Sequence, residues 1–433
     1  MRHRVVATAT AVALAAAALT ACGSSESGDG QAESGPVSLT YWAWAPNMDK
    51  VAAIWNKKNP DIKVTVQKQA SGDDLVTKII TASKAHQAPD LVQAEFQALP
   101  TLVSNDALAD ISKEVADAKD AFAPGLWQQT TLGSDAVYAV PQDSGPLMFF
   151  YRTDLFQQFG LKVPTTWDEF AATARTLRTK APDKSLTTFS SNDSGLFAGL
   201  AQQAGAQWWT AQDQKWKVGI DDPATRKVAD FWGGLVKEGA VDNQPMYTPA
   251  WNKALNTGQQ IAWVSAVWAP GVLTTAAPDT KGKWAMAPLP QWDTAEPATG
   301  SWGGSTTAVT TDSKHKAAAA KFAAWLNTDP EALAALVKEA GIYPAATAAQ
   351  TGGALAAPPE FFAGQADFYT KAAEIAKTTA PAAWGPNVNV AYTSFKDEFG
   401  KAAKAKSDFG AALTTMQSAT VADLKKQGFE VAP

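Results

Sequence analysis

The chain has 433 residues, more than one ordinary hydrophobic core accommodates, so about two domains are expected. Apolar residues make up 46% and charged residues 18%, and the mean hydropathy is -0.17, which indicates a globular protein in water rather than a disordered or membrane-embedded one. The formal net charge is -5 and no basic run occurs, which argues against nucleic acid as a partner.

The first residues have the pattern of an export signal. The basic stretch Arg2–Arg4 precedes Val5–Thr20, an uncharged apolar run that is short for a membrane span. The run ends in Leu-Thr-Ala-Cys, which resembles the bacterial lipobox, whose cysteine becomes the lipidated first residue of the mature protein. We therefore predict a lipoprotein signal peptide over residues 1–22, lipidation at Cys22 and a flexible tether over residues 23–36. Cys22 is the only cysteine, so neither a disulfide nor a cysteine-based metal site is expected, and a buried or free thiol is the alternative to lipidation.

Strands and helices alternate at the start of the mature chain. The expected order is strand, helix, strand, helix and strand, at Val37–Trp44, Lys50–Lys57, Ile62–Val66, Leu75–Lys84 and Asp90–Val92. Such alternation predicts an α/β fold with a parallel sheet and crossover helices, and ligands of these sheets lie beyond the carboxyl ends of the strands. Four residues are thereby placed near one rim of the sheet: Trp42, Trp44, Glu95 and Phe96.

The stretch Tyr138–Arg152 marks a change of domain. Short apolar segments flank Pro141–Pro146, where Pro, Asp, Ser and Gly concentrate, so we predict strand, bend and strand, with Asp143 held at the bend. A second crossing is expected where Ser301–Ser305 leads into a strand, and a third at Gly341–Pro344. These crossings divide the chain into a first lobe of residues 37–140 and 301–343 and a second lobe of residues 147–300 and 344–433.

Several helix starts follow capping patterns. Thr166 has Glu169 three residues later, which is the spacing of a capping box, and Asp222 and Asp329 each precede a proline at the first helical position. Further strands are expected at Gln259–Trp268 and Trp284–Leu289, further helices at Ala317–Leu326 and Pro330–Glu339, and helix beyond Pro344 apart from Ala380–Asn389.

Taken in order, these segments resemble the extracellular solute-binding proteins of bacterial ABC importers, in particular the sugar-binding group that includes maltose-binding protein. The matching pieces span nearly the whole mature chain: the lipobox, LTYWAW, NPDIKVTVQ, APDLV, YAVPQDSGPLMFFYRTDLF, VPTTWDEF, GQQIAWVSAVWAPG and FAAWLNTDPE. The resemblance implies a two-lobed, type II periplasmic-binding-protein-like α/β fold, with a sugar held between lobes joined by hinge crossings. It also implies a non-enzymatic monomer, lipid-anchored at the outer face of the cell membrane, that delivers the sugar to ABC permease subunits.

Seventeen tryptophans suit an aromatic-lined sugar site, because the C–H faces of a pyranose are apolar while its rim carries hydroxyls. Trp268, at a strand end before a Pro-Gly turn, matches a tryptophan that stacks on sugar in the maltose-binding relative. The other candidate ligand contacts, with core packing or turn capping as their alternative, are Trp42, Trp44, Glu95, Phe96, Asp143, Trp208, Trp302, Gly303 and Trp384. Core packing is expected for Trp55, Trp127, Trp167, Trp232, Trp263 and Trp325. Gln93–Gln97 replaces the binding residues of that relative, so the resemblance does not identify the sugar.

Enzymatic functions have little support in the sequence. No HExxH, GxSxG, Walker A or GxGxxG pattern occurs and only three histidines are present, so no metal site and no cofactor are expected. The main alternative is a secreted, lipid-anchored glycoside hydrolase, which needs two carboxylates in an aromatic cleft, such as Asp143 with Glu95 or Asp293. A binding protein for a non-sugar solute is the other alternative. The predicted function is a lipid-anchored substrate-binding component that captures a mono- or oligosaccharide and delivers it to a membrane permease.

Overall fold

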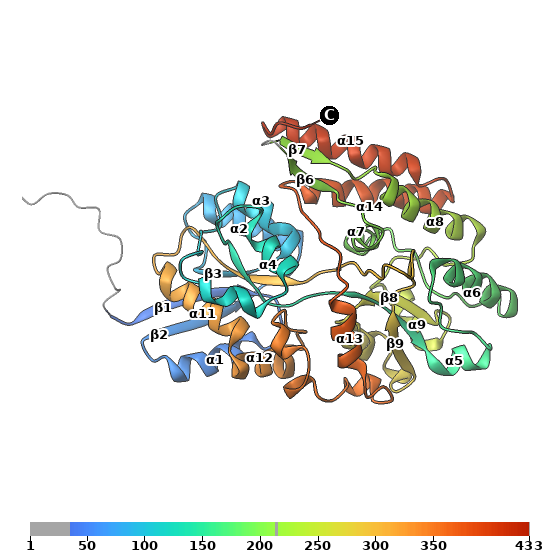
Figure 1. Cartoon of the computed structure of the whole chain (residues 1–433), viewed down its shortest axis with the longest axis horizontal. Coiled ribbons are helices and arrows are strands. Elements are labelled where there is room, and N and C mark those ends of the chain that lie inside the picture. Colours follow the sequence, from blue (N-terminus) through green and yellow to red (C-terminus); the bar gives the residue numbers. More distant parts are fainter. Residues whose placement is uncertain (1–34, 213–214, 433) are drawn as a thin grey trace, which may run out of the picture. The chain divides into compact units, whose positions relative to one another are not determined.

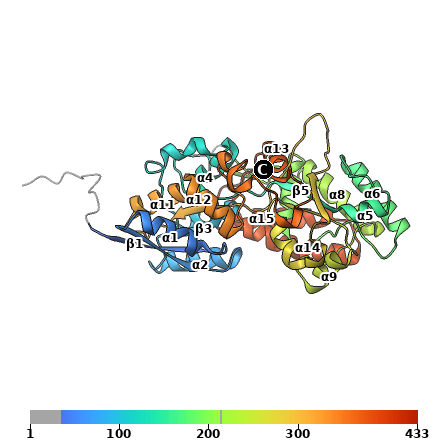
Figure 2. The same ribbon diagram turned by 90° about the horizontal axis from the view of Figure 1, so that it is seen from below.

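The computed structural model describes residues 35–212 and 215–432. The predicted signal peptide, with Cys22, and the predicted tether up to residue 34 lie outside the described residues. From Pro36 onward the chain is built around two β-sheets, whose strands and helices form separate groups in both views (Figures 1 and 2). Among the described helices, none combines the length and the apolar character that a bilayer span requires.

The first sheet has five strands in the order β2-β1-β3-β10-β4, over Ile62–Lys68, Val37–Ala43, Leu91–Glu95, Ser305–Val309 and Ala139–Pro141. β1 runs parallel to β2 and β3, whereas β10 runs antiparallel to β3 and β4. The prediction of a parallel sheet is therefore wrong, because the sheet is mixed. β10 enters it from the side of the second sheet, at the edge where β3 and β4 end, and so runs in the opposite direction to them. The helices around this sheet are α1 (Met48–Lys58), α2 (Asp73–Lys84), α3 (Leu99–Ser104), α4 (Pro124–Thr131), α11 (Lys316–Thr328) and α12 (Pro330–Ala335).

The second sheet is antiparallel, in the order β8-β5-β9, over Ala262–Ala266, Leu147–Arg152 and Trp284–Pro288. Its central strand β5 is apolar and buried on both faces, as its composition predicted. A separate hairpin of β6 (Trp209–Gln212) and β7 (Lys215–Val218) was not predicted. The helices around this sheet are α5 (Thr153–Gln158), α6 (Trp167–Lys180), α7 (Ser194–Gln203), α8 (Pro223–Glu238), α9 (Pro249–Thr257), α10 (Ala269–Ala276), α13 (Phe368–Ala376), α14 (Val388–Ala405) and α15 (Gly410–Lys426).

The predicted helix starts are confirmed by their caps. Asp222 accepts a hydrogen bond from the Thr225 N–H at 2.6 Å, and Asp329 accepts one from the Glu331 N–H at 2.9 Å. Thr166 accepts one from the Glu169 N–H at 3.1 Å, but the Glu169 carboxylate reaches back one residue further than a capping box requires, to the N–H of the preceding threonine.

Two predicted elements differ from the structure. The strand expected over Gln259–Trp268 covers only Ala262–Ala266, because α10 already begins at Ala269 with Pro270 in its first turn. Beyond Pro344 the chain was expected to be helical, yet residues 345–367 hold only short 3₁₀ turns. Two successive glycines with φ of 76° and 51°, at Gly352 and Gly353, and the following Pro358-Pro359 pair interrupt any longer helix there.

The segment Pro141–Leu147 crosses between the two sheets and pairs with two other segments. On one side, the Leu147 N–H donates to the Gly300 carbonyl at 2.9 Å, and the Trp302 N–H donates to the Gly145 carbonyl at 2.8 Å. On the other side, the Ser144 N–H donates to the Tyr343 carbonyl at 3.2 Å. A Cβ atom on Gly145 would lie 2.1 Å from the Trp302 carbonyl oxygen, so only glycine fits this close approach.

We call each sheet with its helices a lobe, the first lobe around β1 and the second around β5. The apolar cores of the two lobes are separate clusters. Ala345 and Ala346 pack in the first-lobe core and Leu355 in the second-lobe core, so the chain leaves the first lobe a few residues beyond the predicted boundary at residue 343.

Candidate functional site

A cleft lies at the edge of the first sheet where β1, β3 and β4 end. Two adjoining cavities of about 240 Å³ and about 510 Å³ open here. They share five lining residues: Glu95, Ser144, Asp193, Trp302 and Gly303. Because both lobes and the crossing segments line each cavity, we treat the two as one space, the interlobe cleft. Its place at the carboxyl ends of the strands is where α/β sheets bind ligands.

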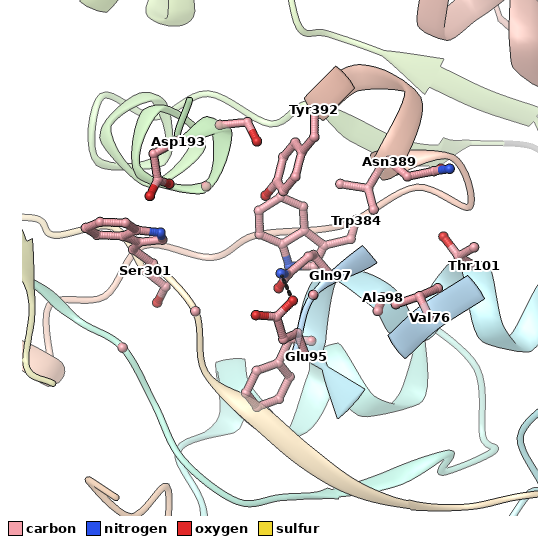
Figure 3. Close-up of a pocket in the computed structure, with 18 of the residues that line it drawn as sticks. Val76, Glu95, Gln97, Ala98, Thr101, Asp193, Ser301, Trp384, Asn389 and Tyr392 are labelled. Atoms are coloured by element: carbon pink, nitrogen blue, oxygen red, sulfur yellow. Dashed lines mark hydrogen bonds between the residues drawn. The ribbon is translucent and has the colours of Figure 1, made fainter. Parts of the chain in front are cut away.

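The first-lobe wall is formed by the segments that follow β1 and β3. Trp44 lines the cleft, and its backbone N–H and that of the next residue each donate to Gln93 Oε1 at 3.1 Å. The amide nitrogen of the buried Gln93 side chain donates to Ser305 Oγ on β10 at 2.9 Å. Gln93 therefore holds the loop that carries Trp44 against the sheet. Glu95, at the end of β3, accepts a hydrogen bond from the Gln97 side chain at 2.8 Å (Figure 3).

The second-lobe wall carries a largely buried carboxylate at the start of α7. Asp193 caps this helix and accepts a hydrogen bond from the Leu196 N–H at 3.1 Å. Burial raises the pKa of Asp193 to about 6, although the N–H groups at the helix start, the charge of Lys396 and the Trp302 side chain act in the opposite direction. Figure 3 shows the Asp193 carboxylate turned into the space between it and Glu95. The cleft thus holds an acceptor whose charged form is destabilised by burial.

Indole rings form the aromatic part of the second-lobe wall. The rings of Trp268 and Trp302 meet edge to face with centroids 4.7 Å apart, and Trp268 Nε1 donates to the Trp302 carbonyl at 3.0 Å. Trp263 packs edge-on against both rings from the core side and is itself buried. Trp268 is half-buried and is held at a fixed angle by these contacts, which suits a platform for a flat apolar ligand face.

Tyr247 lines the wide cavity and was missed by the sequence analysis. This residue is 47% exposed, more than any other large hydrophobic residue within residues 35–212 and 215–432. Its φ of 62° is left-handed, a conformation that is strained for a bulky aromatic residue. The signal in the sequence was a tyrosine held between Pro245 and Pro249 in a loop. A strained backbone that presents an exposed ring to a cleft is typical of a functional position.

Asp143 lies at the bend of the central crossing and lines the wide cavity. Its carboxylate accepts a hydrogen bond from the backbone N–H of Ser305. Burial raises the pKa of Asp143, and the hydrogen bonds from Ser305 act against that shift. The residue therefore links the first two crossings as well as facing the cleft.

The remaining predicted contacts fall into two groups. Phe96, Trp384 and Gly303 line the cleft, and Trp384 Nε1 donates across the lobes to Gln129 Oε1 at 3.1 Å. Trp42 and Trp208 do not line it. Trp42 donates to Gln67 Oε1 at 2.8 Å on the neighbouring strand β2.

Trp208 lies in the second-lobe core, where it is 4% exposed. Its Nε1 atom donates to the Thr225 hydroxyl of α8 at 3.1 Å, and its ring packs on Phe197. A polar partner inside the core therefore accounts for this tryptophan without a ligand.

The carboxylate pair considered for hydrolysis is only partly assembled. Asp143 and Glu95 both line the wide cavity, whereas Asp293 is exposed on a loop and accepts a hydrogen bond from the Ala295 N–H at 2.8 Å. Asp293 lines neither cavity of the cleft. Among the described residues, no group of three His, Cys, Asp or Glu side chains is placed to hold a metal ion.

Comparison with known proteins yields one consistent family. The family model described as bacterial extracellular solute-binding protein matches residues 38–333. The lactose-binding protein of Rhizobium radiobacter is 26% identical over 347 residues, which cover 76% of this chain and 79% of that protein. The arabinooligosaccharide-binding protein of Bacillus subtilis is 24% identical over 326 residues, covering 71% and 72% of the two chains.

The structural similarity extends over nearly the whole described chain. The galacto-N-biose/lacto-N-biose I-binding protein of an ABC transporter from Bifidobacterium longum superimposes with a TM-score of 0.83 and 28% sequence identity. The match covers 93% of this chain and 100% of that one.

Replacing Asp193 by asparagine should raise the free energy of unfolding at neutral pH. Because its pKa is raised, the folded protein binds the Asp193 proton more tightly than the unfolded chain does. The stabilising contribution of the protonated carboxyl is therefore present at low pH and is lost as the pH rises through about 6. Asparagine caps a helix as well as aspartate does but carries no charge. We expect a gain of about 1–3 kcal/mol at pH 8 and a much smaller one at pH 4.5, measured by urea unfolding.

The matched control is Asp222→Asn, which changes the cap of α8 outside the cleft in the same way. A gain at pH 8 that is equal for both variants would mean that the cleft position of Asp193 has no part in the effect.

Proposed function

Since the chain belongs to the family of bacterial extracellular solute-binding proteins, we propose that it is the substrate-binding component of an ABC importer. It captures a neutral mono- or oligosaccharide in the interlobe cleft and delivers it to the membrane permease. The observation that carries this proposal is the combination of indole rings and carboxylates on walls that belong to different lobes.

The chemistry of the walls suits a sugar ring. Trp268 and Trp384 offer flat apolar surfaces for the C–H faces of a pyranose. Glu95 and Asp193 offer acceptors for its hydroxyls, and a carboxylate can accept two hydroxyl hydrogen bonds at once. Such pairs of acceptors discriminate between sugars that differ in the configuration of one hydroxyl.

The charges of the cleft favour a neutral ligand. Its lining includes the carboxylates Glu95, Asp143 and Asp193, while Lys396 is the one cation among its described lining residues. The start of α7 would otherwise bind an anion, but Asp193 already occupies the N–H groups there. Phosphorylated and acidic sugars would therefore meet like charge in the centre of the cleft.

Ligand capture proceeds by closure of the lobes about the crossings. A sugar that contacts Trp44 on one wall and Trp268 on the other gains all of its contacts only when the lobes are close. It therefore shifts the population toward the closed form, by the difference between its affinities for the two forms. The permease then distinguishes loaded from empty protein by the closed shape.

We further propose that the protein releases its sugar unchanged. Asp143 already accepts a hydrogen bond from the Ser305 N–H, and Asp293 lies away from the cleft, which argues against both carboxylate pairs considered from the sequence. This supports a receptor rather than a glycoside hydrolase.

Lipid attachment at Cys22 would keep the receptor at the outer face of the cell membrane, close to its permease. The support is the apolar run that ends in Leu-Thr-Ala-Cys. Cys22→Ser should abolish labelling of the protein by a clickable fatty acid and leave it in the medium or as an unprocessed precursor. Labelling that persists in this variant would refute the anchor.

A carbohydrate panel tests the function directly. At a ligand concentration of roughly 100 times Kd, a bound sugar should raise the Tm by about 3 °C, because only the folded protein binds it. We expect stabilisation by one or more neutral sugars and none by their phosphorylated or uronic acid counterparts, measured by thermal shift. Chromatography after prolonged incubation should recover the sugar intact. Stabilisation by charged sugars alone would contradict the proposal, as would steady release of hydrolysis products.

Trp268→Ala should weaken binding of the sugar found in that panel by about 30-fold. Stacking on one sugar face buries roughly 80–100 Å² of apolar surface, worth about 2 kcal/mol. The measurement is isothermal titration calorimetry. Trp251→Ala is the matched control, because Trp251 is fully buried beneath the cleft wall and its loss should cost about 3–5 kcal/mol of folding stability instead. Unchanged affinity in a folded Trp268→Ala protein would show that the stacking platform lies elsewhere.

A further inference from the structure

The interlobe cleft does not end at Trp268. A third cavity of about 250 Å³ adjoins the wide one, and four residues line both: Trp268, Gly341, Ile342 and Tyr343. We propose that this third cavity, the distal cavity, takes a terminal unit of the ligand, so that the preferred sugar is an oligosaccharide of three or more units. The inference rests on the proposed function and adds the length of the chain.

The distal cavity is built from both lobes, as the cleft is. Val337 and Ile342 line it from the first-lobe side, and Gly271, Phe361 and Tyr369 line it from the second-lobe side. A sugar unit placed here would contact both walls. Occupation of the distal cavity would therefore favour the closed form in the same way as occupation of the cleft itself.

Aromatic rings supply the apolar surface of the distal cavity. The rings of Tyr343 and Tyr369 are nearly parallel, with an interplanar angle of 12° and centroids 6.3 Å apart. Phe361 and the Trp268 ring line the same space. The charged groups of its rim, Lys281 and Glu360, form a salt bridge with each other in solvent. Apolar faces without a free buried charge suit a neutral pyranose.

The hydroxyl of Tyr343 is the polar group that the fold leaves unused. Tyr343 is 4% exposed, and its hydroxyl has no hydrogen-bond partner in the described protein. Burial raises the pKa of this phenol, with a smaller contribution from the nearby Tyr369. A buried hydroxyl without a partner is costly to the fold, and a ligand hydroxyl can complete its hydrogen bonding. A sugar unit in the distal cavity would supply the missing partner of this hydroxyl.

The test compares ligand lengths in two sugar series, maltose against maltotriose and β-1,6-galactobiose against β-1,6-galactotriose, by isothermal titration calorimetry. In a series that binds, the third unit should raise the affinity of the unmodified protein about 10-fold, equivalent to one buried hydrogen bond and a ring contact. Tyr343→Phe should reduce this gain to less than about threefold. The same variant should melt about 1–3 °C higher without ligand, because it removes an unsatisfied buried group.

Tyr41→Phe is the matched control, because the Tyr41 hydroxyl is also buried but donates to Gln142 Oε1 at 3.0 Å. Its removal should lower the Tm and leave the ratio of trisaccharide to disaccharide affinity unchanged. Equal affinity for two and three units in each series that binds would overturn the inference and leave the proposed function intact. A tenfold gain that survives Tyr343→Phe would overturn the role of the hydroxyl. Failure of every sugar in both series and in the wider panel would remove the proposed function, and the inference with it.

Discussion

The pairing of three crossing segments side by side is the constraint on which the rest of the structure depends. Pro141–Leu147 lies in the middle, with Gly300–Ser305 on one side and Tyr343–Ala345 on the other, and backbone hydrogen bonds join each pair. The buried side chain of Gln142 extends this pairing into the first lobe, since its Oε1 atom accepts hydrogen bonds from the hydroxyls of Tyr41 and Thr307 at 3.0 Å and 2.7 Å. A hinge made of hydrogen-bonded segments would restrict the lobes to a few relative motions, which is what reproducible closure on a ligand requires.

Several groups of the cleft reduce the stability of the empty protein. Asp193 is a carboxylate held where burial disfavours its charge, and Tyr247 has a strained backbone. Tyr343 buries a hydroxyl that no protein group satisfies. These three costs arise in different ways, yet all three residues line the cleft. A chain under selection for stability alone would replace them, so their shared position is itself an argument that the cleft binds a ligand.

Much of the fold could be predicted because its signals are local. A few consecutive residues determine the caps at Asp222 and Asp329 and the apolar strand β5, and these features appear where expected. The direction of β10 was not predictable in this way, because it depends on where the chain re-enters the first lobe. Local sequence could not distinguish individual tryptophans for the same reason. Trp208 and Trp302 each lie next to or near a glycine, and only the folded chain shows that Trp208 has the Thr225 hydroxyl as a partner in the core, whereas Trp302 lines the cleft.

Because the cleft lies on the crossings, the proposed ligand binding and lobe closure would depend on the same residues. Asp143, Ser144 and Trp302 belong to the crossing segments, and all three line the cleft. Ser144 is 7% exposed and its hydroxyl has no partner in the described protein, so a sugar hydroxyl near it would form its hydrogen bond with the hinge itself. A ligand that contacts only the lobes can affect the crossing segments only by changing the distance between the lobes. A ligand that also contacts the hinge would act directly on the segments whose geometry sets that separation, so the free energy of binding would be coupled to closure without any intermediate residue.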